Sequence, residues 1–497
     1  MRDLDGNPSN LARREFCPSQ GDFGTAIAAV LKVNQMAFIF YDLETTGTLT
    51  AFDQILQFAA IKTDDELSIL DTFDVRCRLL PHIVPSPEAL LVTGVEVADL
   101  TDAPISHFEM MRQIHAKMRA WSMGGAVFVG WNSMKFDEAM LRQAYYQTLL
   151  PIYQTNTNGN GRADIMRMAQ VVAACLPNSL AVPLDATGKR IFKLALVAEA
   201  NAIVLDNAHE AMSDTSATLA IAQLIKRRTP ALWDAMIANA RKAGPINLIR
   251  NNSILLLSET YGGAAYNLVV APIIANANNA NEWAMFDLQF DPCPLLDADD
   301  PTLRTAIDGE VKQIRRTSIN AQPSLLPLGF FPDDVCGGRL PLATYQARAQ
   351  AVREHADFRK RVARLLAERY ADQEPSRYVE EKIYAGFAAP ADESRMRYFH
   401  EHKWAERPGI IKVLEDDRFR KLGKRVIASE RFDLLSDQER GGWQAWRRNR
   451  LLADGDVPWL TIAAASAQTA ELEQDSSSEQ RQQLTEIKRF LMSRGTR

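Results

Sequence analysis

Two carboxylates at the end of an apolar run form the pair in this sequence whose spacing most clearly favours chemistry. The run Phe38-Ile39-Phe40-Tyr41 leads directly into Asp42-Leu43-Glu44, and Thr45-Thr46-Gly47 follows. Side chains two residues apart on a β-strand project from the same face, so Asp42 and Glu44 would lie side by side. Adjacent buried carboxylates repel each other, and a divalent cation that prefers hard oxygen ligands would offset this repulsion. Taken alone, the pattern also fits an acidic turn that closes a strand.

Two further segments place acidic residues where an apolar strand gives way to a helix. The strand expected at Val127–Gly130 leads to Asp137 in the first turn of the next helix, where an aspartate would also favour the helix dipole. Further along, His209 lies five residues before Asp214, in a loop that enters a helix. Separately, these two would be a surface histidine and a helix cap. Four acids and one histidine at three such junctions together indicate one site.

The segments between residues 37 and 229 alternate apolar strands with helical patterns, which predicts an α/β domain. Strands are expected at Ala37–Tyr41, Gln57–Ile61, Thr72–Arg78 and Val127–Gly130, and helices at Phe136–Gln147, Asp164–Cys175, Lys193–Ala200 and Ser213–Arg227. Arg228-Thr229-Pro230 predicts a domain edge.

The remainder of the chain changes character. Ala264–Pro272 and Glu282–Phe290 predict a β-hairpin, residues 341–371 predict one basic helix, and the chain is mostly helical from there to about residue 470. Asp475-Ser476-Ser477-Ser478 resembles a linker. The tail after it carries Leu484, Ile487 and Leu491 on one side.

Length and composition limit the class of protein. The chain has 497 residues, 46% of them hydrophobic, which predicts two or three domains. It contains no apolar run long enough to span a membrane, and acidic residues precede its first apolar stretch, so we expect a cytoplasmic protein. Five scattered cysteines without a CxxC pair argue against a disulfide framework and a zinc site. Because the net charge is −5, any DNA affinity must come from local basic surface.

The set Asp42, Glu44, Asp137, His209 and Asp214 resembles the DEDD exonucleases of the RNase H-like fold, in the subclass whose last motif is His-x4-Asp. The segments that resemble the bacterial exonuclease I family are Gln57–Ile61, Thr93-Gly94, Gly130-Trp131-Asn132, Asn207-Ala208-His209 and Tyr384-Ala385-Gly386-Phe387. The resemblance implies an α/β RNase H-like exonuclease domain, then a small SH3-like β-containing domain, then a C-terminal mainly helical domain. The expected ranges are an N-terminal extension over 1–35 (disordered, or preceding a true start at Met36), the exonuclease domain over 36–230, the SH3-like domain with its basic helix over 231–372, the helical domain over 373–470, and a linker with a short tail over 471–497.

The resemblance also implies roles for the five residues. Asp42 would bridge two Mg²⁺ ions, for which Mn²⁺ can substitute, while Glu44 and Asp214 complete one metal site and Asp137 helps to hold the other. His209 would be the general base, and its ordinary pKa near working pH suits that task. The implied reaction is removal of 5′-mononucleotides from the 3′ end of single-stranded DNA, in repair or recombination.

Substrate contacts are implied in the same way. Residues in positions that resemble DNA contacts of the family are Glu44, Thr45, Arg142, Tyr153, Arg167 and Lys193, the last of which replaces an arginine. Basic clusters that could touch a single strand are Lys312 with Arg315-Arg316, the stretch Arg418–Arg425, and Trp446–Arg450. The partners expected are single-stranded DNA and, as a candidate, a single-strand-binding protein. We expect a monomer with no membrane partner.

Two other functions fit parts of this pattern. An RNA-trimming or proofreading exonuclease would use the same active site, although such proteins lack some 260 residues of additional domains. A catalytically silent module that binds single strands would have lost a metal-binding acid, and none is missing. Because all five catalytic residues precede residue 230, the first domain is expected to cleave short oligonucleotides if it folds alone.

Overall fold

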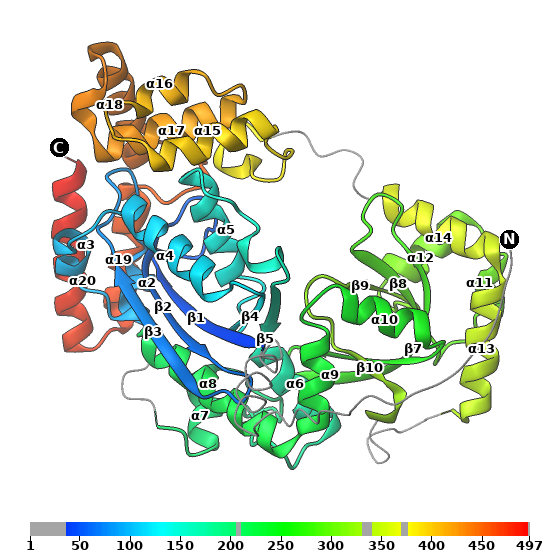
Figure 1. Cartoon of the computed structure of the whole chain (residues 1–497). Coiled ribbons are helices and arrows are strands. Elements are labelled where there is room, and N and C mark those ends of the chain that lie inside the picture. The colour runs from blue at the N-terminus through cyan, green and yellow to red at the C-terminus, as the bar shows by residue number, and fades with distance from the viewer. Residues whose placement is uncertain (1–35, 205–209, 331–339, 369–375, 496–497) are drawn as a thin grey trace, which may run out of the picture.

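A five-stranded mixed sheet forms the centre of the N-terminal part of the protein. The computed structural model describes residues 36–204, 210–330, 340–368 and 376–495 (Figure 1). The strands are β1 (Ala37–Thr45), β2 (Ile55–Thr63), β3 (Ile69–Arg76), β4 (Ala126–Gly130) and β5 (Gly161–Asp164), in the order β3-β2-β1-β4-β5. The central strand β1 pairs antiparallel with β2 and parallel with β4. This order confirms the α/β fold expected for the first domain.

Helices cover both faces of this sheet, and the alternation along β1 decides which residues meet which helices. They are α2 (Pro87–Thr93), α3 (Val97–Asp102), α4 (His107–Trp121), α5 (Asp137–Gln147), α6 (Ile165–Cys175), α7 (Leu194–Ala200), α8 (Ala211–Arg228) and α9 (Pro230–Ala238). Phe38 and Phe40 pack in a core with α6, α8 and α9, whereas Ile39 and Tyr41 pack on the other face with α4 and α5. Asp42 and Glu44 continue the alternation of Phe38 and Phe40, so both project from the face of the sheet that α8 covers.

A second sheet, entirely antiparallel, follows in the chain. Its strands are β6 (Leu255–Tyr261), β7 (Ala264–Ala275), β8 (Glu282–Asp287), β9 (Ile314–Ser318) and β10 (Leu325–Pro327), in the order β10-β6-β7-β8-β9. The expected hairpin is β7–β8. Short helices α10 (Ala243–Asn251), α11 (Cys293–Leu296) and α12 (Asp300–Asp308) accompany this SH3-like domain.

The single basic helix expected over residues 341–371 is wrong, because the structure has two helices there. They are α13 (Leu342–Glu354) and α14 (Ala356–Glu368), and they are separated at His355, whose backbone is not helical. The His355 Nδ1 atom accepts a hydrogen bond from the Phe358 backbone N–H at 3.1 Å, so the histidine caps the start of α14. Because the sequence has a helical pattern on both sides of His355, this break between two helices could not be predicted from it.

The C-terminal part is helical; in Figure 1 its first four helices lie above the first sheet and its last two lie at the left of the sheet. Its helices are α15 (Pro390–Glu401), α16 (Arg407–Lys412), α17 (Asp417–Glu430), α18 (Asp437–Leu452), α19 (Ile462–Asp475) and α20 (Ser478–Gly495). Helix α19 runs across residue 470, and α20 is not a separate tail: Ile487 and Leu491 are fully buried in a cluster with Leu90 and Val95 of the first domain. The amphipathic pattern of the tail therefore serves to attach it to the exonuclease domain.

The core also continues across residue 230, where a domain edge was expected. Trp233 of α9 packs on Phe38 of β1, with ring centroids 5.8 Å apart. The Asn239 side-chain amide, which is fully buried, donates hydrogen bonds to the carbonyl oxygens of Pro323 and Leu325 at the start of β10. Helix α9 thus joins the first sheet to the SH3-like domain.

The remaining structural expectations concern cysteines and the membrane. In the described segments, Cys77, Cys175 and Cys293 are not joined in disulfide bonds. Within the same segments, every helix is too short or too polar to cross a lipid bilayer.

Candidate active site

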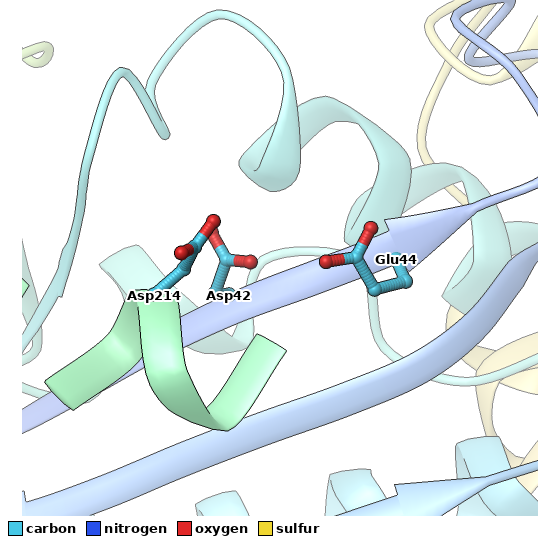
Figure 2. Close-up of side chains that lie close together, drawn as sticks. All are labelled: Asp42, Glu44 and Asp214. Atoms are coloured by element: carbon cyan, nitrogen blue, oxygen red, sulfur yellow. The ribbon is translucent and has the colours of Figure 1, made fainter. Parts of the chain in front are cut away.

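Three carboxylates from two elements converge at the α8 side of the first sheet. Asp42 and Glu44 project from β1, and Asp214 comes from the first turns of α8 (Figure 2). One oxygen atom from each lies within 4.8 Å of the other two. Because α8 packs directly against β1, the fold brings Asp214 to a pair that precedes it by some 170 residues in the sequence. This arrangement of hard oxygen donors fits a divalent metal cation.

The electrostatics of the cluster show how strongly its charges oppose one another. Burial, followed by the charges of Asp214 and Asp137, raises the pKa of Glu44 from 4.5 to about 8. Burial, and then the charges of Asp137, Glu44 and Asp214, raise the pKa of Asp42 well above its usual value. Carboxylates of this kind are costly to keep ionised unless a cation neutralises them. Metal binding is the physical reason for gathering them here.

Asp137 lies beside this cluster, at the first position of α5, and is buried. Burial is the main cause that raises its pKa from 3.8 to about 7. The turn that delivers it from β4 needs glycine at 130, because a Cβ atom there would lie 2.5 Å from the Ser133 Cβ. Asn132 takes a left-handed conformation (φ 57°) in this turn, and its backbone N–H donates to the Asp164 carboxylate at 2.9 Å. The turn is thereby tied to the end of β5.

Glu138, directly after Asp137, is the residue of this site that the sequence reasoning missed. Its Oε1 atom accepts hydrogen bonds from Thr155 Oγ1 at 2.5 Å, from Arg142 Nε at 2.8 Å and from Arg162 at 3.0 Å. Its Oε2 atom accepts one from the Tyr41 hydroxyl at 3.3 Å. Glu138 is only 3% exposed, so this network fixes the N-terminus of α5, and with it Asp137, against β1 and β5. The only sequence signal was the i, i+4 spacing of Glu138 and Arg142.

His209, the expected general base, lies outside the described residues. Its neighbour Glu210 is described and caps α8, accepting a hydrogen bond from the Ser213 backbone N–H at 3.1 Å. Glu210 also accepts a hydrogen bond from the Gln57 amide at 2.7 Å and pairs with Arg76 at 3.3 Å. The cap is therefore Glu210 and not Asp214, which leaves the Asp214 carboxylate directed toward Asp42 (Figure 2).

The side chains expected to contact substrate are in different situations. Thr45 is buried, and its hydroxyl donates to the Gly47 carbonyl at 2.8 Å. Arg142 is held by Glu138 and lies over the Tyr153 ring, 5.2 Å from its centroid. Arg167 donates to the carbonyls of Ala321 and Gln322 at 2.6 and 2.9 Å, so part of its guanidinium joins the SH3-like domain to the exonuclease domain. Lys193 is exposed at the start of α7.

Comparisons with known proteins agree with this geometry. The Exonuclease family model matches residues 39–222, which include Asp42, Glu44, Asp137 and Asp214, and the Exonuclease I C-terminal domain model matches residues 377–493. Exodeoxyribonuclease I of Escherichia coli strain K12 is 28% identical over 431 residues, which cover 83% of this chain and 90% of that protein.

Solved structures extend the likeness through the SH3-like domain. The crystal structure of E. coli Exonuclease I in complex with a dA16 oligonucleotide matches with a TM-score of 0.82 at 24% identity, over 93% of this chain and 100% of that one. A moderately thermophilic Exonuclease I from Methylocaldum szegediense matches with a TM-score of 0.80 at 25% identity, again over 93% and 100%. With both family models in their expected order and relatives matched over most of their length, this chain belongs to the bacterial exonuclease I family.

Proposed function

We propose that this protein is a 3′–5′ exonuclease that hydrolyses single-stranded DNA to 5′-mononucleotides. The observation that carries the proposal is the convergence of Asp42, Glu44 and Asp214 within 4.8 Å, next to the buried Asp137. The name and substrate of the relatives support it, since their solved structures include complexes with dA16 and dT13 oligonucleotides.

The four carboxylates would hold two divalent cations, Mg²⁺ or Mn²⁺, which supply charge neutralisation and orientation for hydrolysis of a phosphodiester. Glu44 and Asp214 would help to hold one cation and Asp137 the other, and Asp42 would contribute to both. His209 would take the proton from the attacking water, because imidazole titrates near the working pH. Water then attacks the terminal phosphodiester, the bond to the 3′ oxygen of the preceding nucleotide breaks, and a 5′-mononucleotide leaves.

The rest of the site would hold the strand. Arg142 and Tyr153 lie together, and Phe387 of the helical domain is 84% exposed with its ring 6.0 Å from that of Tyr153. An exposed ring beside a guanidinium suits an unstacked base and its phosphate. Lys193, Thr45 and the free part of the Arg167 guanidinium would add further contacts.

RNA trimming is the second candidate for substrate, because the four carboxylates do not discriminate between the sugars. The two later domains favour single-stranded DNA as the substrate, since the Exonuclease I C-terminal domain model matches the helical domain and the matched Exonuclease I structure covers the SH3-like domain as well. We place the enzyme in the cytoplasm, in DNA repair or recombination. A single-strand-binding protein is the candidate partner, since one matched structure is described as SSB/Exonuclease I.

The proposal is tested with purified protein, Mg²⁺ and 5′-labelled substrates: single-stranded DNA, duplex DNA and RNA of one sequence. We expect a ladder shortened from the 3′ end with single-stranded DNA, little product from the other two, and none in EDTA. Asp42→Ala should bind the single strand but leave it intact. Shortening from the 5′ end, preferred cleavage of RNA, or normal turnover by Asp42→Ala would each contradict the proposal.

A further inference from the structure

A cavity of about 680 Å³ opens in the helical domain between α17, α18 and the segment 377–382. It contains none of the carboxylates of the candidate active site. Among the described residues that line it, seven carry Arg or Lys side chains and three carry acidic ones. The wall of the cavity is therefore cationic in a chain whose net charge is −5, which favours an anionic ligand.

The charges differ between the base of the cavity and its mouth. At the base, Glu380 is 3% exposed and pairs with Arg425 at 2.8 Å and with Arg450 at 3.5 Å. Because Arg425 and Arg450 carry two positive charges against the single negative charge of Glu380, the base of the cavity has a net positive charge. At the mouth, Lys424 and Lys421 are exposed, and Lys421 pairs with Asp417 at 2.6 Å. An anion at the mouth would meet these two ammonium groups together with the carboxylates of Asp417 and Glu439, which line the cavity as well.

Aromatic rings line the same cavity. Trp443 and Trp446 of α18 are stacked, with centroids 4.9 Å apart and an interplanar angle of 28°, and the Arg425 guanidinium lies 4.2 Å from the Trp446 centroid. Tyr378 and Trp459 make a second, edge-on pair with centroids 5.2 Å apart. Flat rings beside cations suit a ligand that is both flat and anionic.

Two adjacent glycines in α18 provide a way to test the cavity. Glycine inside a helix costs about 1 kcal/mol relative to alanine, so a packing reason is normally expected. No such reason exists here, because a Cβ atom at Gly441 or at Gly442 would meet nothing within 4 Å. Gly442 lines the cavity and Gly441 does not. A side chain added at 442 would therefore change the wall of the cavity, whereas one added at 441 would not.

We propose that this cavity binds a nucleotide, with its base against the tryptophan rings and its phosphate at Lys424 and Lys421. The volume lies within the range of about 300–1,000 Å³ typical of small-molecule sites, and stacking of one base on an aromatic ring contributes about 1–3 kcal/mol. The nucleotide is either a unit of a single strand, held at a second place away from the carboxylates, or a free mononucleotide. The strand alternative rests on the proposed function.

The back of the cavity touches the turn that follows the catalytic strand. Phe52 in that turn packs against Tyr378 and Trp459, with ring centroids 6.0 and 5.8 Å apart, and the Arg450 guanidinium lies 5.1 Å from the Phe52 centroid. Thr46 in the same turn donates to Asp53 at 2.9 Å. A strand held in the cavity would therefore also be held close to the turn between β1 and β2.

The test measures binding of fluorescein-labelled dT12 to the full chain by anisotropy in EDTA, so that no cleavage occurs. Gly442→Leu adds a side chain at the wall of the cavity, where a Cβ atom meets nothing within 4 Å. Gly441→Leu is its matched control, with the same change in helix propensity at an exposed position outside the cavity. Lys424→Gln removes one cation at the mouth. Thermal unfolding of each variant confirms that the fold is retained.

We expect Gly442→Leu to weaken dT12 binding about tenfold and Gly441→Leu to leave it unchanged, and we expect Lys424→Gln to reduce the slope of log affinity against log salt by about one. Competition with dTMP and with inorganic phosphate distinguishes the sources: loss of dTMP binding with unchanged strand affinity in Gly442→Leu would identify the free mononucleotide. Equal binding of dT12 and dTMP to wild type and Gly442→Leu would overturn the proposal, as would stronger binding of a glutamate-rich peptide than of either nucleotide. Cleavage by the wild type in Mg²⁺ is a separate measurement, so inactivity would refute the proposed function and leave the cavity result standing.

Discussion

Removing the charge of Glu44 is expected to stabilise the metal-free protein at alkaline pH. Glu44 is 7% exposed, and burial together with the charges of Asp214 and Asp137 raises its pKa from 4.5 to about 8. A group whose pKa is raised in the folded state contributes stability that is present below its unfolded pKa and is lost as the pH rises through its folded pKa. Without metal, the wild type should therefore lose stability between about pH 4.5 and pH 8.

The size of the loss follows from the same two values. A tenfold change in proton affinity corresponds to about 1.4 kcal/mol, so the difference between 4.5 and about 8 amounts to about 5 kcal/mol at most. Asp42 and Asp137 also have raised pKa values and can take up protons in place of Glu44. Glu44→Gln alone therefore recovers only part of this free energy of unfolding. We expect Glu44→Gln in EDTA to be about 2–5 kcal/mol more stable than wild type at pH 8.5, and within about 1 kcal/mol of it at pH 5.

The assay is urea unfolding at the two pH values, in EDTA and in excess Mg²⁺. Cation binding to the folded state should raise the stability of the wild type by mass action, and Glu44→Gln should gain less because it has lost a ligand. The difference between the two proteins would then shrink or reverse. Glu199→Gln, at an exposed position of α7, is the matched control and should change nothing. Equal stability of wild type and Glu44→Gln at pH 8.5 in EDTA would refute the account of opposed charges.

Three further outcomes are expected. His209→Ala should lower the cleavage rate at saturating Mg²⁺ by about 10²–10⁴-fold, and a lost metal affinity with a normal saturated rate would show that His209 has another role. Glu138→Gln removes the carboxylate that holds two arginines in a buried network, so it should lower the free energy of unfolding by about 3–5 kcal/mol in urea; unchanged stability would mean that the network does not depend on this charge. A chain ending at residue 230 loses Trp233 from the core on β1 and should therefore lack a cooperative thermal transition, in contrast to the sequence-based expectation that this domain cleaves short oligonucleotides alone. Cleavage by that fragment at the wild-type rate would show that α9 and the SH3-like domain are dispensable for folding.

Four of the five strands and several helices of the first domain could be predicted because each has a strong local cause, whereas β5 and helices α2, α3 and α4 were not predicted. The apolar run before Asp42 predicts a strand, and the two-residue period of a strand alone places Asp42 and Glu44 on one face. The ends were less accurate: β1 continues to Thr45, because Asp42 and Glu44 still pair with β2 in the ladder. Polar residues at a strand end make such a continuation hard to predict. The cost of burying them in a sheet is offset only by neighbours that are far away along the chain.

The later domains show where local pattern is not sufficient. Strands β9 and β10 are five and three residues long and were not predicted, because their pairing with β8 and β6 comes from contacts distant in sequence. In one of the basic clusters, the guanidinium groups of Arg315 and Arg316 lie 3.9 and 3.7 Å from the carboxylates of Asp287 and Glu282, respectively. Two other clusters, on α17 and α18, meet in one cavity. A charge run in the sequence does not show whether its partners are acids of the same protein or an external ligand.

The sequence by itself determined which residues can bind metal, because the types and spacing of Asp42, Glu44, Asp137 and Asp214 follow from the local geometry of strands and helix starts. Only the tertiary structure decided how these groups are held. Glu138 collects its partners from three different elements, and the Gln322 side chain, 158 residues from Asp164, accepts that residue's backbone N–H at 2.6 Å. Such contacts depend on side chains that meet only after the sheet and the SH3-like domain have packed together, so no local period or propensity encodes them.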